Sequence, residues 1–227
     1  MNTLSLILRW LARIVIVILV PFILIMTSVR LLLNPLFLEI EYRVPGFPPD
    51  PYGFTLQDRL QWSKVSIDFL LNNADLSYFN NQKFANGTPI YTDRELSHMI
   101  DVKRLLQTLL NLWLGALVVL LILWLWSWRS GWWLAFRRSV SIGGWVTAGL
   151  IVVIVVLMAI SFTTFFTDFH ELFFTGNSWI FLYSDTFIRL FPIRFWQDCF
   201  TYVGVLSLIG GVLLGWFMRP KAHNLNK

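Results

Sequence analysis

The chain has 227 residues, of which 56% are apolar and 14% are charged, and its formal net charge is +5. Soluble domains usually carry about 25% charged residues, so the composition favours an integral membrane protein. The single cysteine, Cys199, excludes an internal disulfide and a cysteine-based metal site. The positive charge is compatible with nucleic-acid binding, but its distribution along the chain has another explanation, and we expect no nucleic-acid partner.

Four apolar runs are long enough to cross a bilayer, which takes about 20 residues. They cover residues 11–33, 105–126, 140–166 and 199–218. The first run lacks the small-residue cleavage site of a secretory signal peptide, so we interpret it as a retained anchor. Gly211 and Gly215 form a G-x-x-x-G motif in the last run, a pattern typical of close helix packing. We therefore predict an all-α membrane protein whose single membrane domain, residues 1–227, contains four transmembrane helices.

The basic residues predict how these helices are oriented. If both termini are cytoplasmic, the segments on that side hold eight Lys and Arg residues and no acidic residue. All thirteen Asp and Glu residues then fall in the other segments or at their edges. Because Lys and Arg are enriched in cytoplasmic loops, we expect both termini in the cytoplasm. The positive charge is thus explained by membrane topology.

Two outer segments result from this topology, residues 34–104 and residues 167–198. In the first, the stretch EIEYRV (39–44) alternates between polar and apolar residues like a short strand. Thr55 and Asp58 form a capping box that predicts the start of a helix. We expect a small extracytoplasmic cap made of a short helix with minor strand and loop elements.

The outer end of the second span carries a titratable pair. Thr92 and Glu95 form a second capping box, which predicts that this helix begins at Asp93. His98 then lies roughly 10 Å ahead of the apolar run, at about 1.5 Å per residue, at the depth of lipid headgroups and glycerol esters. Asp101 follows one turn later, where it could accept the ring N–H of His98 and fix its tautomer.

His170 follows the third apolar run and is predicted at a similar depth. Because the second and third spans are joined by a short connection, we expect them to be antiparallel neighbours, and packed helices lie about 8–10 Å apart. The two imidazoles could therefore share a site. The alternative also stays open at this point: each histidine alone would be an ordinary polar residue at a wet boundary, and Asp101 could pair with Lys103 or Arg104.

Several motifs resemble a known family. They are YRVPGFPPDPYGFTLQDRL (42–60), HMIDV (98–102), FHELFF (169–174), GNSWIF (176–181) and DTFIRLFPIRFW (185–196). Over nearly its whole length the chain resembles a bacterial family of four-span integral membrane proteins that contains the lipoprotein intramolecular transacylase, Lit. The two histidine motifs are the most specific part of this resemblance.

The resemblance implies an acyltransferase of the bacterial cytoplasmic membrane with its active site facing outside. Such enzymes move the sn-2 acyl chain of a diacylglyceryl-modified lipoprotein to the α-amino group of its N-terminal cysteine, giving a lyso-form lipoprotein. The partners are then lipid-modified proteins and membrane lipid, with no cofactor and no metal. The expected catalytic residues are His98, His170 and Asp101, and the expected substrate-binding residues are Asn177, Trp179 and Arg189.

This chemistry agrees with the residues present. The attacking amine must be neutral and the leaving alkoxide must be protonated, tasks that suit two histidines. Three alternatives remain: a bis-histidine membrane haem protein, a non-catalytic membrane scaffold, and a metal-dependent hydrolase. The last has no H-E-x-x-H or comparable ligand spacing to support it. The sequence also contains no G-x-S-x-G nucleophile elbow.

Overall fold

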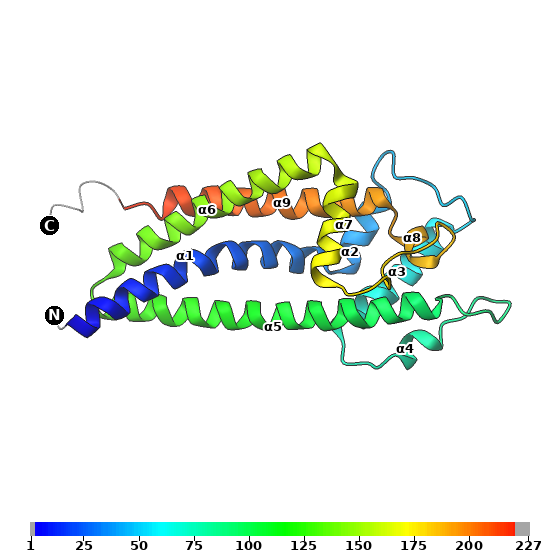
Figure 1. Ribbon diagram of the computed structural model, residues 1–227, viewed down its shortest axis with the longest axis horizontal. Coiled ribbons are helices and arrows are strands. Elements are labelled where there is room, and N and C mark those ends of the chain that lie inside the picture. The colour runs from blue at the N-terminus through cyan, green and yellow to red at the C-terminus, as the bar shows by residue number, and fades with distance from the viewer. Residues whose placement is uncertain (1–2, 221–227) are drawn as a thin grey trace. The chain divides into compact units, whose positions relative to one another are not determined.

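The computed structural model describes residues 3–220, and its regular secondary structure over this range is helical (Figure 1). Its helices are α1 (Thr3–Leu32), α2 (Pro35–Glu41), α3 (Leu56–Leu71), α4 (Ser77–Asn80), α5 (Asp93–Arg129), α6 (Trp133–Ile160), α7 (Phe162–Phe173), α8 (Thr186–Leu190) and α9 (Ile193–Phe217). Four of them, α1, α5, α6 and α9, are long and apolar enough to cross a membrane. The predicted class, an all-α membrane protein with four transmembrane helices, is confirmed.

The strand predicted at residues 39–44 is wrong, because the first half of this stretch belongs to helix α2 and the second half forms a turn. Asn34 caps this helix, its Oδ1 accepting from the backbone N–H of Phe37 at 3.1 Å, and Pro35 takes the first helical position. Leu38 and Glu41, three residues apart, are buried on one side of the helix. The Asn-Pro start signal therefore outweighs a short alternation of polar and apolar residues.

The third span also ends earlier than predicted. Helix α6 stops at Ile160, and Ser161 has an extended backbone conformation, with φ −159° and ψ 102°. The Ser161 hydroxyl accepts from the backbone N–H of Thr164 at 3.2 Å and so caps α7. A serine N-cap inside an apolar run divides the predicted helix of residues 140–166 into two.

The chain divides into two compact units. The bundle unit comprises Met1–Val29, Leu110–Ala159 and Thr201–Lys227, and the loop-rich unit comprises Arg30–Leu109 and Ile160–Phe200. By sequence position, all thirteen acidic residues belong to the loop-rich unit, whereas the bundle unit carries eight Lys and Arg residues and no acid. The segregation of charge expected from the membrane topology therefore coincides with the division of the fold.

In the bundle unit, parts of α1, α5, α6 and α9 pack around a core of Ala12, Ile16, Val20, Trp132, Phe136 and Val140 (Figure 1). Helices α6 and α9 approach each other closely at their glycines. A Cβ atom on Gly144 would lie 2.5 Å from the carbonyl oxygen of Gly211 and 2.6 Å from the backbone nitrogen of Gly215. The close packing predicted from the G-x-x-x-G motif is confirmed, because only glycine leaves room for this contact.

The loop-rich unit places α3 against α5 and α8. The core of this unit includes Trp62, Phe69, Phe79, Tyr91, Leu96 and Phe187. Both predicted capping boxes are present, at Thr55 with Asp58 and at Thr92 with Glu95. Gln107 of α5 donates to the carbonyl oxygen of Asn72 at 2.8 Å and so holds the C-terminal end of α3. Helix α5 begins at Asp93, as its capping box predicted.

The glycine contact can be tested with two alanine substitutions in α6. Gly144→Ala would push a methyl group into the backbone of α9. We expect the free energy of unfolding to fall by about 1–3 kcal/mol, the usual effect of overpacking. Gly149 has open space around its Cα, so Gly149→Ala should be neutral or stabilising by up to about 1 kcal/mol from helix propensity. Thermal unfolding in detergent would measure both, and equal stability of the two variants would contradict the contact.

Candidate functional site

The structure brings His98 and His170 together. His98 is in the second turn of α5, His170 is in the last turn of α7, and both belong to the loop-rich unit. Their ring centroids are 6.0 Å apart with an angle of 28° between the ring planes. The two residues are 8% and 9% exposed. Two imidazoles that are far apart in sequence therefore form one buried pair.

Aromatic side chains surround this pair. The rings that contact one or both histidines, with centroid distances of 4.2 to 5.7 Å, belong to Phe166, Phe169, Phe174, Trp179 and Phe181. Phe174 contacts both histidines, at 4.9 Å from His98 and 5.7 Å from His170. The pair is thus enclosed by apolar walls that limit the access of water.

The two histidines differ in their hydrogen bonds. Nδ1 of His170 lies 2.7 Å from the carbonyl oxygen of Phe166, one turn earlier in α7. A carbonyl oxygen can only accept, so this nitrogen carries the proton and Nε2 holds the lone pair. Nδ1 of His98, in contrast, is buried without a hydrogen-bond partner. One ring is therefore oriented by the backbone and the other by packing alone.

Burial lowers the pKa of His170 below its ordinary value, and the hydrogen bond to the Phe166 carbonyl offsets only part of this effect. Desolvation disfavours the charged form of an imidazole, so His170 is neutral at neutral pH. A neutral ring is the form that can take up a proton.

The expected hydrogen bond from His98 to Asp101 is absent from the described structure. Nδ1 of His98 has no partner, and the Asp101 carboxylate lies 3.9 Å from the guanidinium of Arg104 on the exposed side of α5. Side chains in a helix lean toward its N-terminus, which carries the His98 ring away from a short side chain one turn later. The ion pair with Arg104, an alternative left open by the sequence, is the one that forms.

Comparisons with known proteins can now be set beside this geometry. The model of the family "Lipoprotein intramolecular transacylase Lit" matches residues 14–196. The chain belongs to the Lit family. A protein of Aquifex aeolicus (strain VF5) is 32% identical over 209 residues, which cover 91% of this chain and 92% of that protein.

Solved structures with a similar fold are those of the membrane integral lipoprotein intramolecular transacylase Lit from Bacillus cereus. One superposes with a TM-score of 0.72 at 17% identity, covering 91% of this chain and 92% of that one. A variant in which a histidine is replaced by arginine gives a TM-score of 0.73 at 16% identity, covering 95% and 92% of the two chains. The resemblance to Lit predicted from the sequence is confirmed, and these structures share the fold.

The three substrate-binding residues expected for a Lit protein differ in how they are placed relative to the histidine pair. The Trp179 ring lies 5.1 Å from the His170 ring and forms part of the site. Asn177 is exposed, and its carbonyl oxygen accepts from the backbone N–H of Ile180 at 3.2 Å. Arg189 is already occupied, because it donates to the buried carboxylate of Asp50 at 3.0 Å. Of the three, the described structure places only Trp179 in ring contact with a histidine.

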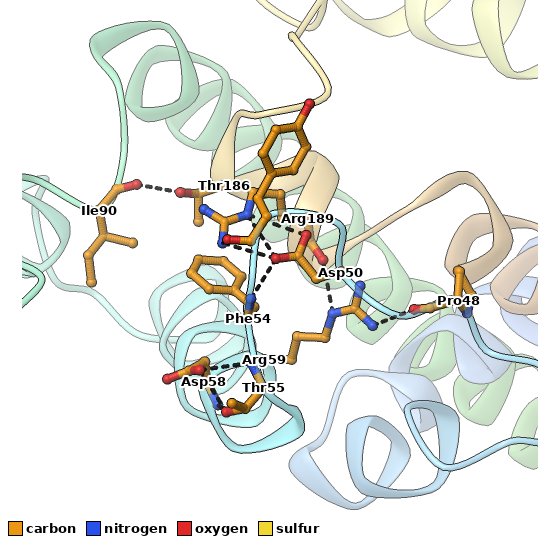
Figure 2. Close-up of polar contacts among 10 residues, drawn as sticks. Pro48, Asp50, Phe54, Thr55, Asp58, Arg59, Ile90, Thr186 and Arg189 are labelled. Atoms are coloured by element: carbon orange, nitrogen blue, oxygen red, sulfur yellow. Dashed lines mark hydrogen bonds and ion pairs between the residues drawn. The ribbon is translucent and has the colours of Figure 1, made fainter.

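Arg189 belongs to a polar network that fixes the residues before α3 against α8. Figure 2 shows the Asp50 carboxylate between the Arg189 guanidinium and the backbone N–H of Phe54, which donates at 2.6 Å. Arg59 donates to the carbonyl oxygen of Arg189 at 3.1 Å and to that of Pro48 at 2.7 Å. Burial alone would raise the pKa of Asp50, but the Arg189 hydrogen bonds hold it below its ordinary value. This arginine stabilises the fold.

Apart from Trp179, the aromatic walls were not predicted from the sequence, although one signal was available. Phe166, His170 and Phe174 recur every four residues, which places the first two on one face of α7 with Phe174 at its C-cap. Phe181 gave no such signal, since it lies in the irregular segment between α7 and α8.

Among residues 3–220, no group of three or more His, Cys, Asp or Glu side chains is close enough to hold a metal ion.

Glu41 is a second buried titratable group that the sequence analysis did not identify. It is 0% exposed, and neither carboxylate oxygen has a hydrogen-bond partner. Its pKa is raised from the ordinary 4.5 to about 7, mainly by burial and also by the nearby Asp198, against a smaller opposing effect of Arg194. The folded protein therefore holds a proton at Glu41 that the unfolded chain releases between these pH values.

This proton makes stability depend on pH. Because the folded state binds the proton more tightly than the unfolded state, the free energy of unfolding should fall as the pH rises from about 4.5 to about 7. Glu41→Gln resembles the protonated acid at every pH, so it should remove this dependence and be more stable than the parent protein at pH 8. Glu39→Gln, in the same helix but exposed, is the matched control. Thermal unfolding of the three proteins at pH 5 and pH 8 would measure this pH dependence of stability. An unchanged pH dependence in Glu41→Gln would refute the role of the Glu41 proton.

Proposed function

We propose that this protein catalyses intramolecular acyl transfer within diacylglyceryl-modified lipoproteins, moving the sn-2 acyl chain to the α-amino group of the N-terminal cysteine. Membership of the Lit family supports the reaction class. The observation that carries the proposal for this chain is the buried pair of His98 and His170, enclosed by aromatic rings. The substrate is lipid-modified protein in the membrane, and the product is a lyso-form lipoprotein.

The reaction balances without an external reactant. The amine nitrogen attacks the ester carbonyl carbon, an N–C bond forms, and the C–O bond to the glyceryl oxygen breaks. One proton leaves the amine and one proton reaches the glyceryl oxygen. No electrons are exchanged with a cofactor, so acid–base groups and hydrogen-bond donors supply what the step needs. This balance supports a cofactor-independent enzyme.

The two histidines suit different roles. The proton on Nδ1 of His170 leaves Nε2 as the base that takes the amine proton, and the resulting imidazolium can return that proton to the glyceryl oxygen. For His98, a proton on the unpartnered Nδ1 would be a buried N–H without an acceptor, which is rarer than a buried lone pair. Its proton is then on Nε2, where it can donate to the developing oxyanion.

The aromatic walls favour attack by the amine over attack by water. Water competes with the amine for the ester, and its attack would release a fatty acid instead of transferring it. A site closed by Phe174, Trp179 and Phe181 admits the apolar acyl chains and keeps water scarce. Trp179 is the expected substrate contact, Asn177 is an exposed polar group that could contact the substrate outside the walls, and Arg189 acts through the fold.

We further infer that both termini are cytoplasmic and that the histidine pair faces the outside of the membrane. The separation of charge between the two units supports this orientation, because the eight Lys and Arg residues of the acid-free bundle unit include those beside both termini. The ester of a lipoprotein in the outer leaflet would then be on the same side as the site.

The catalytic roles predict a strong effect of single substitutions. His98→Ala and His170→Ala should each lower the rate of lyso-lipoprotein formation by about 10²–10⁴, the typical contribution of an acid–base group, while the protein still accumulates in the membrane. Asp101→Asn is the control from the next turn of α5, and it should retain most activity because Asp101 pairs with Arg104. Mass spectrometry of a diacylated lipopeptide after incubation measures the product. Full activity of both alanine variants would rule out this site.

The orientation can be tested separately with introduced cysteines in a Cys199→Ala background. Thr3 and Asn86 are both exposed, in the bundle unit and the loop-rich unit respectively. A membrane-impermeant maleimide added to intact cells should label Asn86→Cys and leave Thr3→Cys unlabelled until the membrane is opened. Labelling of Thr3→Cys in intact cells would reverse the proposed topology.

A further inference from the structure

We propose that Glu95 is a positioning residue for the histidine pair, because its buried carboxylate joins the first turn of α5, which precedes His98, to the first turn of α8. This inference rests on the proposed function for its effect on catalysis. Its structural part, a carboxylate that connects two helices beside the site, stands on the geometry alone.

The Glu95 carboxylate satisfies two elements at once. It is 0% exposed. One oxygen, Oε2, accepts from the backbone N–H of Thr92 at 2.8 Å and from its hydroxyl at 3.0 Å, which completes the capping box of α5. The other, Oε1, accepts from the backbone N–H of Phe187 in α8 at 2.6 Å. The same side chain therefore caps the start of α5 and holds α8.

This connection lies next to the site. His98 follows Glu95 by three residues in α5. On the other side, the Phe187 ring lies 5.9 Å from the Phe181 ring, which lies 5.5 Å from the His98 ring. A second bond, from the Thr186 hydroxyl to the carbonyl oxygen of Ile90 at 2.5 Å, also holds α8 to the residues ahead of α5. Moving α8 away from α5 would therefore displace the aromatic wall of His98.

The role requires a carboxylate of this length. All three contacts come from donors, so both oxygens must accept. In Glu95→Gln, one of the two positions becomes an NH₂ group that faces an N–H, and either the cap of α5 or the bond to α8 is lost. Phe187 is buried, and a backbone donor left unpaired in a buried position is costly.

Asp58 provides a matched control. Its Oδ2 accepts from the backbone N–H of Thr55 at 2.8 Å and from the Thr55 hydroxyl at 2.6 Å, the same capping-box contacts that Glu95 makes. No bond to another helix is recorded for the Asp58 side chain in the described structure. In Asp58→Asn one amide oxygen can still accept both contacts, so the same acid-to-amide change leaves this capping box intact, and comparing the two variants isolates the connection to α8.

Two measurements on the full-length protein in detergent test the proposal. The first is the steady-state transfer reaction with a diacylated lipopeptide. Glu95→Gln should lower kcat by up to about 10²-fold, the effect of a displacement of about 1 Å at a reacting centre, with KM nearly unchanged. The second is the ¹⁹F NMR resonance of fluorotryptophan at Trp179, assigned with Trp179→Phe. It should shift or broaden in Glu95→Gln because the Trp179 ring lies against His170. Asp58→Asn should change neither quantity.

A third measurement needs no variant, in case Glu95→Gln does not fold. The Phe187 amide is in the first turn of a five-residue helix, where an N–H has no partner within the helix. Its hydrogen exchange in the parent protein should be slow because it donates to Glu95. Rapid exchange of this amide would overturn the proposal.

The other outcomes also decide. Equal losses of kcat in Glu95→Gln and Asp58→Asn would reduce Glu95 to an ordinary helix cap and overturn the positioning role, as would an unchanged kcat and an unchanged Trp179 resonance in Glu95→Gln. If the parent protein transfers no acyl group, the proposed function fails. In that case the Trp179 resonance and the Phe187 exchange still report on the connection between α5 and α8.

Discussion

Two imidazoles that must stay neutral while buried impose the main constraint on the loop-rich unit. Desolvation favours the uncharged ring, and the aromatic contacts around His98 and His170 provide it. A carboxylate beside either ring would act in the opposite direction, because it would stabilise the imidazolium and favour a ring that is already protonated. The described structure orients His170 through the carbonyl oxygen of Phe166, which fixes the tautomer without adding a charge.

Four acidic residues of the loop-rich unit carry no unpaired charge. Asp50 and Glu95 are buried, yet their oxygens are occupied by Arg189 and by backbone N–H donors. Glu41, whose oxygens have no hydrogen-bond partner, retains its proton up to a pH of about 7. Asp101 faces Arg104. Each of these carboxyl groups is thus stabilised by hydrogen-bond donors, paired with a cation or protonated. The unit can therefore be rich in acids although, in the described structure, its histidine pair has no hydrogen bond to a carboxylate.

The sequence predicted the parts of this arrangement that depend on local patterns. Long apolar runs, both capping boxes and the G-x-x-x-G motif are signals within one helix or one turn, and they were found where expected except that Ser161 divides the third run. Depth and connectivity allowed a shared site for His98 and His170, but the rotation of the helices, which decides it, could not be predicted. The partner of His98 was predicted wrongly because residue spacing gives a side chain's position on a helix but not its direction. The roles of Arg189 and Glu95 depend on α8, which is distant in sequence from both Asp50 and Thr92.

The wall of aromatic residues gives a reason why a transacylase would enclose its histidines instead of exposing them. The amine of a lipid-modified cysteine is tethered to the ester it attacks, so its effective concentration is high without further binding. Water is the remaining competitor, because it fills an open site. A site that excludes water also leaves its acid–base groups without hydration. Because His170 is buried, its ring is a weaker base than an imidazole in water. Tethering offsets this loss, because an intramolecular attack needs less assistance than one by a freely diffusing nucleophile.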